Sequence, residues 1–162
     1  SASRGRLSLR SDDLATLLDE VRSCDDATFL DRRRGPALVL MHGPLTTAES
    51  STSRYVLRKA KVVIPRGERS EILTLGRHPD NDVVAPWTSI SRFHAALVFG
   101  RDRALLVDRG SRNGTYVGGQ RLVADMPRVL SDRDEISFGH ELHGQLLSTR
   151  SLLATLRSLQ AA

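Results

Sequence analysis

The chain has 162 residues, of which 40% are apolar and 27% are charged, and its formal net charge is +5. This length supports one domain with a self-sufficient core, and the arginine-rich excess of positive charge favours acidic or phosphorylated partners. Cys24 is the only cysteine, no apolar run is long enough to span a membrane, and no secretion signal opens the chain, so we expect a cytoplasmic protein without intrachain disulfides.

The first 44 residues are predicted to form an N-terminal extension. Residues 11–13 read Ser-Asp-Asp, which offers an N-cap and acidic groups, and apolar residues follow at spacings of three and four over 14–21. This pattern predicts a short amphipathic helix. The apolar run at 37–41 is consistent with a short strand. Residues 45–54 are rich in Thr, Ser, Ala and Glu, so they are predicted to form a linker.

From residue 55 to residue 147 the pattern changes to short apolar and β-branched runs, separated by Gly, Pro, Asn and Asp. Such runs with closely spaced turns are typical of a β-sandwich or β-barrel, so we expect an all-β domain here. The expected strands are residues 55–64, 71–75, 93–99, 104–108, 115–117, 128–130, 135–138 and 142–147.

Residues 148–162 return to a helical period, with leucines at 152, 153, 156 and 159 on one face. We expect a C-terminal amphipathic helix. Its apolar stripe is expected to pack either on the sandwich or the N-terminal helix of the same chain, or on a second copy or a partner.

Several loop residues are suited to an anionic ligand. Arg77 follows a predicted strand, and its guanidinium offers forked donors and a permanent charge that suit a phosphate group. Ser91 can donate its hydroxyl hydrogen to a phosphate oxygen, and Arg92 beside it adds further donors. Asn113 and Gly114 are first of all a turn signal, because both residues tolerate a positive φ. These loops are therefore expected to converge on one ligand.

Three blocks carry a resemblance: Gly-Arg at 76–77, Ser-Arg-Phe-His at 91–94 and Gly-Ser-Arg-Asn-Gly-Thr at 110–115. Over residues 55–147 the chain resembles the forkhead-associated (FHA) domain, a two-sheet β-sandwich that reads phosphothreonine peptides. The resemblance implies that Asn113 holds the ligand's main chain and that His94 braces a loop. The full set of implied phosphopeptide contacts is Arg77, Ser91, Arg92, Ser111, Arg112 and Asn113, supported by Gly76, His94 and Gly114.

Other chemistries lack the residues they need. A catalytic pair of Ser91 and His94 would require a nucleophile elbow and an oxyanion hole, and the sequence signals neither. One cysteine rules out a thiolate metal cluster, while His140 and His143 should face opposite sides of a strand. A nucleic-acid role is favoured only by net charge, because aromatic residues make up 4% of the chain. We predict no enzyme activity, no cofactor and no metal.

The leading prediction is a non-catalytic adaptor that binds a threonine-phosphorylated protein or peptide in a Ser/Thr kinase pathway. The linker places Thr46, Thr47 and Thr52 near the domain, so the phosphorylated linker itself is a second candidate ligand. The alternative is an interaction or oligomerisation module that uses the terminal helices independently of phosphorylation.

Overall fold

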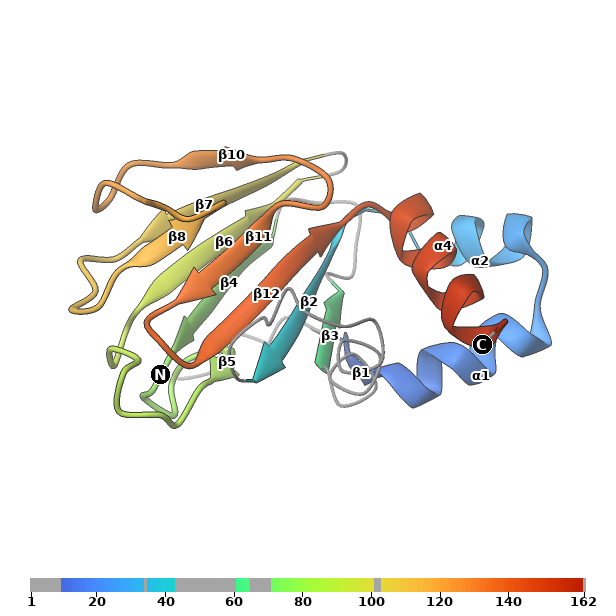
Figure 1. The fold of residues 1–162 in the computed structure, drawn as a ribbon, viewed down its shortest axis with the longest axis horizontal. Helices are drawn as coiled ribbons and strands as arrows, with labels where there is room; N and C mark the ends of the chain where they lie inside the picture. Colours follow the sequence, from blue (N-terminus) through green and yellow to red (C-terminus); the bar gives the residue numbers. More distant parts are fainter. Residues whose placement is uncertain (1–9, 34, 43–60, 65–70, 101–102, 162) are drawn as a thin grey trace.

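The computed structural model of the chain describes residues 10–33, 35–42, 61–64, 71–100 and 103–161, which form twelve strands and three helices (Figure 1). The first part contains β1 (Arg10–Asp13), α1 (Leu14–Ser23), α2 (Asp26–Arg32), β2 (Ala37–His42) and β3 (Lys61–Ile64). The middle part contains β4 (Glu71–Gly76), β5 (Val83–Val84), β6 (Ala95–Phe99), β7 (Ala104–Asp108), β8 (Thr115–Val117) and β9 (Gln120–Arg121). The last part contains β10 (Arg128–Leu130), β11 (Glu135–Phe138), β12 (Leu142–Leu147) and α4 (Thr149–Gln160).

The strands form two sheets that pack face to face. A seven-stranded sheet has the order β1-β3-β2-β12-β11-β8-β9, and a five-stranded sheet has the order β10-β7-β6-β4-β5. Neighbouring strands in the described residues run antiparallel, with the parallel pair β4–β5 as the exception. The predicted two-sheet sandwich with flanking helices is confirmed.

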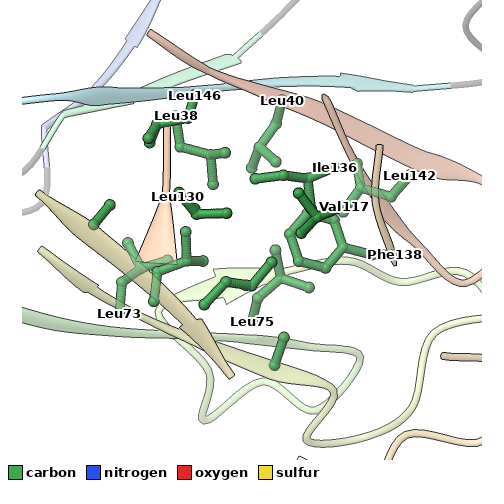
Figure 2. Close-up of a cluster of buried hydrophobic side chains, with 14 of the residues drawn as sticks. Leu38, Leu40, Leu73, Leu75, Val117, Leu130, Ile136, Phe138, Leu142 and Leu146 are labelled. Atoms are coloured by element: carbon green, nitrogen blue, oxygen red, sulfur yellow. The ribbon is translucent and has the colours of Figure 1, made fainter. Parts of the chain in front are cut away.

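The main core lies between the two sheets. Successive side chains on a strand point to opposite faces, so in strands such as β7 and β11 alternate residues enter this core. The register aligns Leu73 of β4 with Leu97 of β6, and both side chains are fully buried. In Figure 2, Leu73 from the five-stranded sheet faces Leu38 and Leu146 from β2 and β12. This packing holds the strand ends that carry the loops described below.

A second apolar cluster lies at one end of the sandwich, where the three helices pack together (Figure 1). Both predicted terminal helices are confirmed. The apolar stripe of α4 packs on α1 and α2 of the same chain, which was one of its two expected destinations. The buried members are Leu14, Leu17, Leu18, Val21, Phe29, Ala37, Val39, Leu147, Leu152, Leu153, Leu156 and Leu159.

The N-terminal segment differs from the prediction in two places. Residues 11–13 were expected to cap a helix, but Arg10–Asp13 form β1, which pairs antiparallel with β3, and α1 begins at Leu14. The additional helix α2 was not expected. Asp25 is its N-cap, with a carboxylate that accepts a hydrogen bond from the Thr28 N–H at 2.8 Å.

Helix α4 is anchored at both of its ends. Ser148 is its N-cap, and Asp132 from the β10–β11 turn accepts the Ser148 N–H at 2.7 Å and the hydroxyl of Ser151. Burial raises the pKa of Asp132, but these hydrogen bonds outweigh it and hold the pKa below its usual value. At the other end, Arg157 donates to the Asp26 carboxylate of α2 at 2.7 Å. The helices are thus tied to one another and to the sandwich.

Most of the predicted strands are confirmed. The strand expected at 93–99 is shorter and begins at Ala95, since the preceding residues belong to a loop. Strands β1, β5 and β9 were not predicted. The strands confirmed to within one residue are those expected at 71–75, 104–108, 115–117, 128–130, 135–138 and 142–147.

The predicted linker at 45–54 lies outside the described residues, as do residues 55–60 of the first predicted strand. The boundaries between extension, linker and domain therefore stay predictions. Although β2 precedes the linker, it pairs with β12 and β3 in the seven-stranded sheet. The sandwich of this chain thus takes strands from both sides of residues 43–60.

Candidate functional site

Three loops meet at the end of the sandwich opposite the helices (Figure 1). The β4–β5 and β5–β6 loops are joined by a hydrogen bond from the Arg77 N–H to the Ser91 carbonyl at 2.9 Å. The β7–β8 loop joins them because the Arg112 N–H donates to Ser91 Oγ at 2.9 Å. The three expected loops are therefore in direct contact. They comprise residues 77–82, 85–94 and 109–114.

The cationic side chains on these loops are accessible. Arg77, Arg92 and Arg112 are all exposed. Arg77 Nε donates to the Ile90 carbonyl at 3.2 Å, which fixes the side chain and uses one of the guanidinium's five N–H donors. An exposed guanidinium that is anchored in this way loses little further freedom when it binds an anion.

Ser91 stands where the three loops join. Its N–H donates to His94 Nδ1 at 3.0 Å, and its hydroxyl oxygen accepts from Arg112. An oxygen that accepts a hydrogen bond keeps its own hydrogen for donation. The Ser91 hydroxyl, half-buried beside the exposed arginines, is therefore available as a donor to an anion.

His94 braces two of the loops from beneath. Its side chain is fully buried, and its Nε2 lies 2.9 Å from the Gly114 carbonyl, while Nδ1 accepts from Ser91. Both bonds require the neutral ring with hydrogen on Nε2. Burial lowers the pKa of His94, against the opposing effects of the Gly114 carbonyl and Asp108. The two bonds, to Ser91 and to Gly114, are the contacts through which His94 would brace the loops as the resemblance implies.

Gly76 allows the first two loops to approach each other. A Cβ at this position would lie 2.2 Å from the Arg92 carbonyl oxygen and 2.8 Å from Asn81 Nδ2. Asn81 in turn donates to that same carbonyl at 2.7 Å and to the His78 carbonyl at 2.9 Å. Asn81 was not predicted as part of the site.

Asp108 organises the start of the β7–β8 loop. Its carboxylate accepts from the Gly110 N–H at 3.0 Å, from the Thr115 hydroxyl at 2.7 Å, and from the hydroxyl and N–H of Ser111. Burial raises the pKa of Asp108, but the bonds from Ser111 and Thr115 outweigh it and lower the pKa overall. Ser111 is itself buried, so its predicted ligand contact stays a prediction that would require the hydroxyl to leave Asp108.

Asn113 is held in place by a chain of hydrogen bonds. Its Nδ2 donates to the Ser89 carbonyl at 2.8 Å, and the Ser89 hydroxyl donates to the Glu141 carboxylate at 3.1 Å. Gly114 follows with a φ of +87°, a conformation that favours glycine, and its carbonyl accepts from the Gly139 N–H at 2.9 Å. The β11–β12 turn therefore supports the loop that carries Asn113, a role that the sequence did not indicate.

The arrangement is suited to binding an anion. It presents guanidinium groups, a hydroxyl and an amide on loops held by a buried scaffold. Both ring nitrogens of His94 are occupied by backbone groups, so this histidine is not poised as a base for Ser91.

The described residues offer neither a metal-binding cluster nor a membrane-spanning helix. They contain no group of three or more His, Cys, Asp or Glu side chains that could hold a metal ion. Within the same part of the chain, no helix is long and apolar enough to cross a membrane.

Comparisons with known proteins converge on one family. A family model described as FHA domain matches residues 73–139. The chain is 31% identical to the glycogen accumulation regulator GarA of Mycolicibacterium smegmatis over 74% of this chain and 77% of that protein. It is 36% identical to an oxoglutarate dehydrogenase inhibitor of Corynebacterium jeikeium over 49% of this chain and 59% of that protein.

A solved structure agrees with the sequence comparisons. The FHA domain of the CT664 protein from Chlamydia trachomatis is 25% identical and superimposes with a TM-score of 0.51, covering 68% of this chain and 96% of that domain. Sequence and fold therefore lead to the same assignment: the chain belongs to the FHA domain family.

Proposed function

We propose that this chain is a non-catalytic adaptor that binds threonine-phosphorylated segments of proteins. The observation that carries the proposal is the junction of Arg77, Ser91 and Arg112. A backbone bond joins the first two residues, and the third donates its N–H to the Ser91 hydroxyl. One dianionic group placed at this junction meets forked donors and a hydroxyl hydrogen together.

We assign to the residues the roles that the family resemblance implies, and their positions support these assignments. Arg77 and Ser91 contact the phosphate, with Arg92 beside them, and Arg112 assists from the third loop. Asn113 holds the main chain of the ligand, because its amide is fixed at the rim by Ser89. A phosphate bearing a charge of about −1.5 to −2 at neutral pH is thereby matched by fixed positive charge.

The relatives support a regulatory role, and we propose that a Ser/Thr kinase produces the phosphorylated ligand. One of them is named a regulator of glycogen accumulation and another an inhibitor of oxoglutarate dehydrogenase. We infer that this chain regulates by binding a partner, and that phosphorylation of the partner controls the binding. The linker with Thr46, Thr47 and Thr52 lies outside the described residues, so its service as a ligand stays a prediction.

Titration calorimetry with a pool of phosphothreonine peptides and the matching unphosphorylated pool tests the proposal. We expect binding of the phosphorylated pool alone. Arg77→Ala should weaken it by about 2–5 kcal/mol, or roughly 30-fold or more, because a phosphate charge loses its main partner. Arg150→Ala is the matched control, since Arg150 is an exposed arginine on α4, at the end of the sandwich opposite the three loops.

Two outcomes contradict the proposal. Equal affinity for the two pools would show that the phosphate is not recognised. Release of inorganic phosphate during incubation would show that the chain hydrolyses its ligand rather than holding it.

A further inference from the structure

A line of apolar side chains crosses the outer face of the five-stranded sheet. The strand register pairs Ile72 of β4 with Val98 of β6, and Val98 with Leu105 of β7. Leu105 pairs in turn with Val129 of β10. Successive side chains on a strand point to opposite faces, and the chain neighbours of these four residues lie in the main core. The buried neighbours are Leu73, Leu97, Leu106 and Leu130.

A second line on the same face is uncharged as well. Thr74 of β4 pairs with Ala96 of β6, and Ala96 pairs with Val107 of β7. Val84 of β5 adds to this face, since its chain neighbour Val83 packs against the main core. The two lines and Val84, which we call the outer-face patch, contain no charged side chain, although 27% of the residues in the chain are charged.

Much of the outer-face patch is accessible to solvent. Ile72 and Val129 each have a relative exposure of 56%, and Val84 has 47%. Val98 and Leu105 are half-buried between their neighbours on the sheet. The apolar helix cluster draws on α1, α2, α4, β2 and β12, so the helices cover the end of the sandwich and leave this face open (Figure 1). Single exposed apolar side chains are ordinary, but a contiguous patch marks an interaction surface.

The charge distribution favours a second copy of the chain as the occupant of this patch. In a symmetric dimer the same surface lies on both sides of the interface, so a charged side chain near the two-fold axis faces its own copy. Like charges opposed in this way are destabilising. The outer-face patch is self-complementary because it has no charge, whereas the chain as a whole carries a net charge of +5.

The size of the patch indicates a weak dimer. Neighbouring strands lie about 4.8 Å apart and alternate residues of one strand about 6.8 Å apart, so two lines across four strands cover about 300 Å². Two such patches face to face bury about 600 Å² before the rim is added, which is below the area of a standard stable interface. Aligned packing of two sheets about 10 Å apart is also how the inner faces of this sandwich meet.

We propose that the outer-face patch packs against the same patch of a second copy and so forms a weak symmetric dimer. Val98 and Leu105 lie near the middle of the contact, with Ile72 and Val129 toward its two sides. The three loops of the candidate site connect strand ends and lie outside the patch, so the dimer carries two such sites. The proposal does not depend on what those loops bind.

Sedimentation equilibrium of the full chain at concentrations from about 5 µM to about 1 mM tests the proposal. We expect the average mass to rise from that of one chain toward that of two. Ile72→Lys and Val129→Lys should each raise the dissociation constant by about tenfold or more, because the dimer would bury an unpaired charge. Both positions are exposed in the single chain, so each variant should keep the wild-type thermal unfolding curve by circular dichroism.

Ala154→Lys is the matched control, since it adds the same charge at an exposed position of α4, away from the sheet face. It should leave the dissociation constant unchanged. Addition of about 0.5 M NaCl should not dissociate the dimer, because salt screens the repulsion between copies of like charge. A wild-type chain that stays monomeric over the whole range overturns the proposal. Dimerisation that persists unchanged in both lysine variants, or that is lost on addition of salt, overturns it too, because the contact then uses another surface.

Discussion

Replacing Gly76 by alanine tests how closely the first two loops of the candidate site must approach each other. The added Cβ would lie 2.2 Å from the carbonyl oxygen and 2.8 Å from the carbonyl carbon of Arg92. Both atoms belong to the backbone, so no side-chain rotation relieves the contact. The two loops must move apart, and Arg77 and Ser91 move with them.

The expected loss of stability follows from two contributions. Forcing a side chain into a close-packed site costs about 1–3 kcal/mol. Separation also weakens the bonds from the His78 N–H and from Asn81 Nδ2 to the Arg92 carbonyl, each worth about 1 kcal/mol. The free energy of unfolding should therefore fall by about 3–5 kcal/mol, which lowers Tm by roughly 10 °C for a chain of this size.

Urea unfolding followed by circular dichroism measures the change, and Gly100→Ala provides the control. A Cβ at Gly100 would meet its nearest neighbours, atoms of Arg103, at an ordinary 3.6 Å, so this variant should keep its stability within about 1 kcal/mol. Phosphopeptide affinity should fall in the Gly76 variant alone. If both variants unfold at the same urea concentration and bind equally, the close approach at Gly76 does not hold the site together.

Two further predictions concern the buried base His94 and the exposed acid Asp132. His94→Gln should lower stability by about 1–3 kcal/mol, because its amide nitrogen can replace Nε2 but it has no acceptor in the place of Nδ1. Because the pKa of His94 is lowered in the folded chain, wild-type stability should be full above the unfolded value of about 6.5 and decline as pH falls below it. The pKa of His143 is lowered too, so wild-type stability alone does not isolate the effect of His94. The test is whether the difference in the free energy of unfolding between wild type and His94→Gln becomes smaller at acidic pH. Asp132→Asn should loosen the start of α4, because asparagine keeps one acceptor oxygen and its NH2 group cannot accept the other of the bonds from the Ser148 N–H and the Ser151 hydroxyl. Deuterium exchange of the α4 amides should then accelerate while the amides of β6 stay protected. In wild type the hydrogen bonds to the Asp132 carboxylate should weaken as pH falls below its unfolded pKa of about 3.9. The pKa of Asp132 is lowered in the folded chain, so protonation in acid removes the stability that the carboxylate contributes.

The elements that were predicted have a local signal, and those that were missed do not. Strands such as β7 and β12 alternate buried and half-buried residues, so their periodicity is visible in the sequence. By contrast, β1 reads Arg-Ser-Asp-Asp, without an apolar residue, and is a strand because it pairs with β3. Strands β5 and β9 have two residues each, which is too short for any period.

The same distinction applies to the candidate site. Arg77, Ser91 and Asn113 were expected from short motifs, and the structure brings their loops together. Asn81 and Glu141 act on carbonyl and hydroxyl groups that are 11 and 52 residues away in the chain. A role of this kind depends on the folded arrangement, so no local pattern predicts it.

The positions of the helices bear on the alternative function, in which the terminal helices recruit partners independently of phosphorylation. Their apolar faces are already buried against each other, with Leu17, Val21 and Leu156 at 0% exposure. A partner would have to open this cluster or use the polar faces of the helices. The three loops of the candidate site lie at the opposite end of β12 and carry exposed arginines, so binding there requires no such opening. A ligand at the loops and a partner on the helices would thus bind at opposite ends of the sandwich, so a helix-bound partner should not compete with a phosphopeptide.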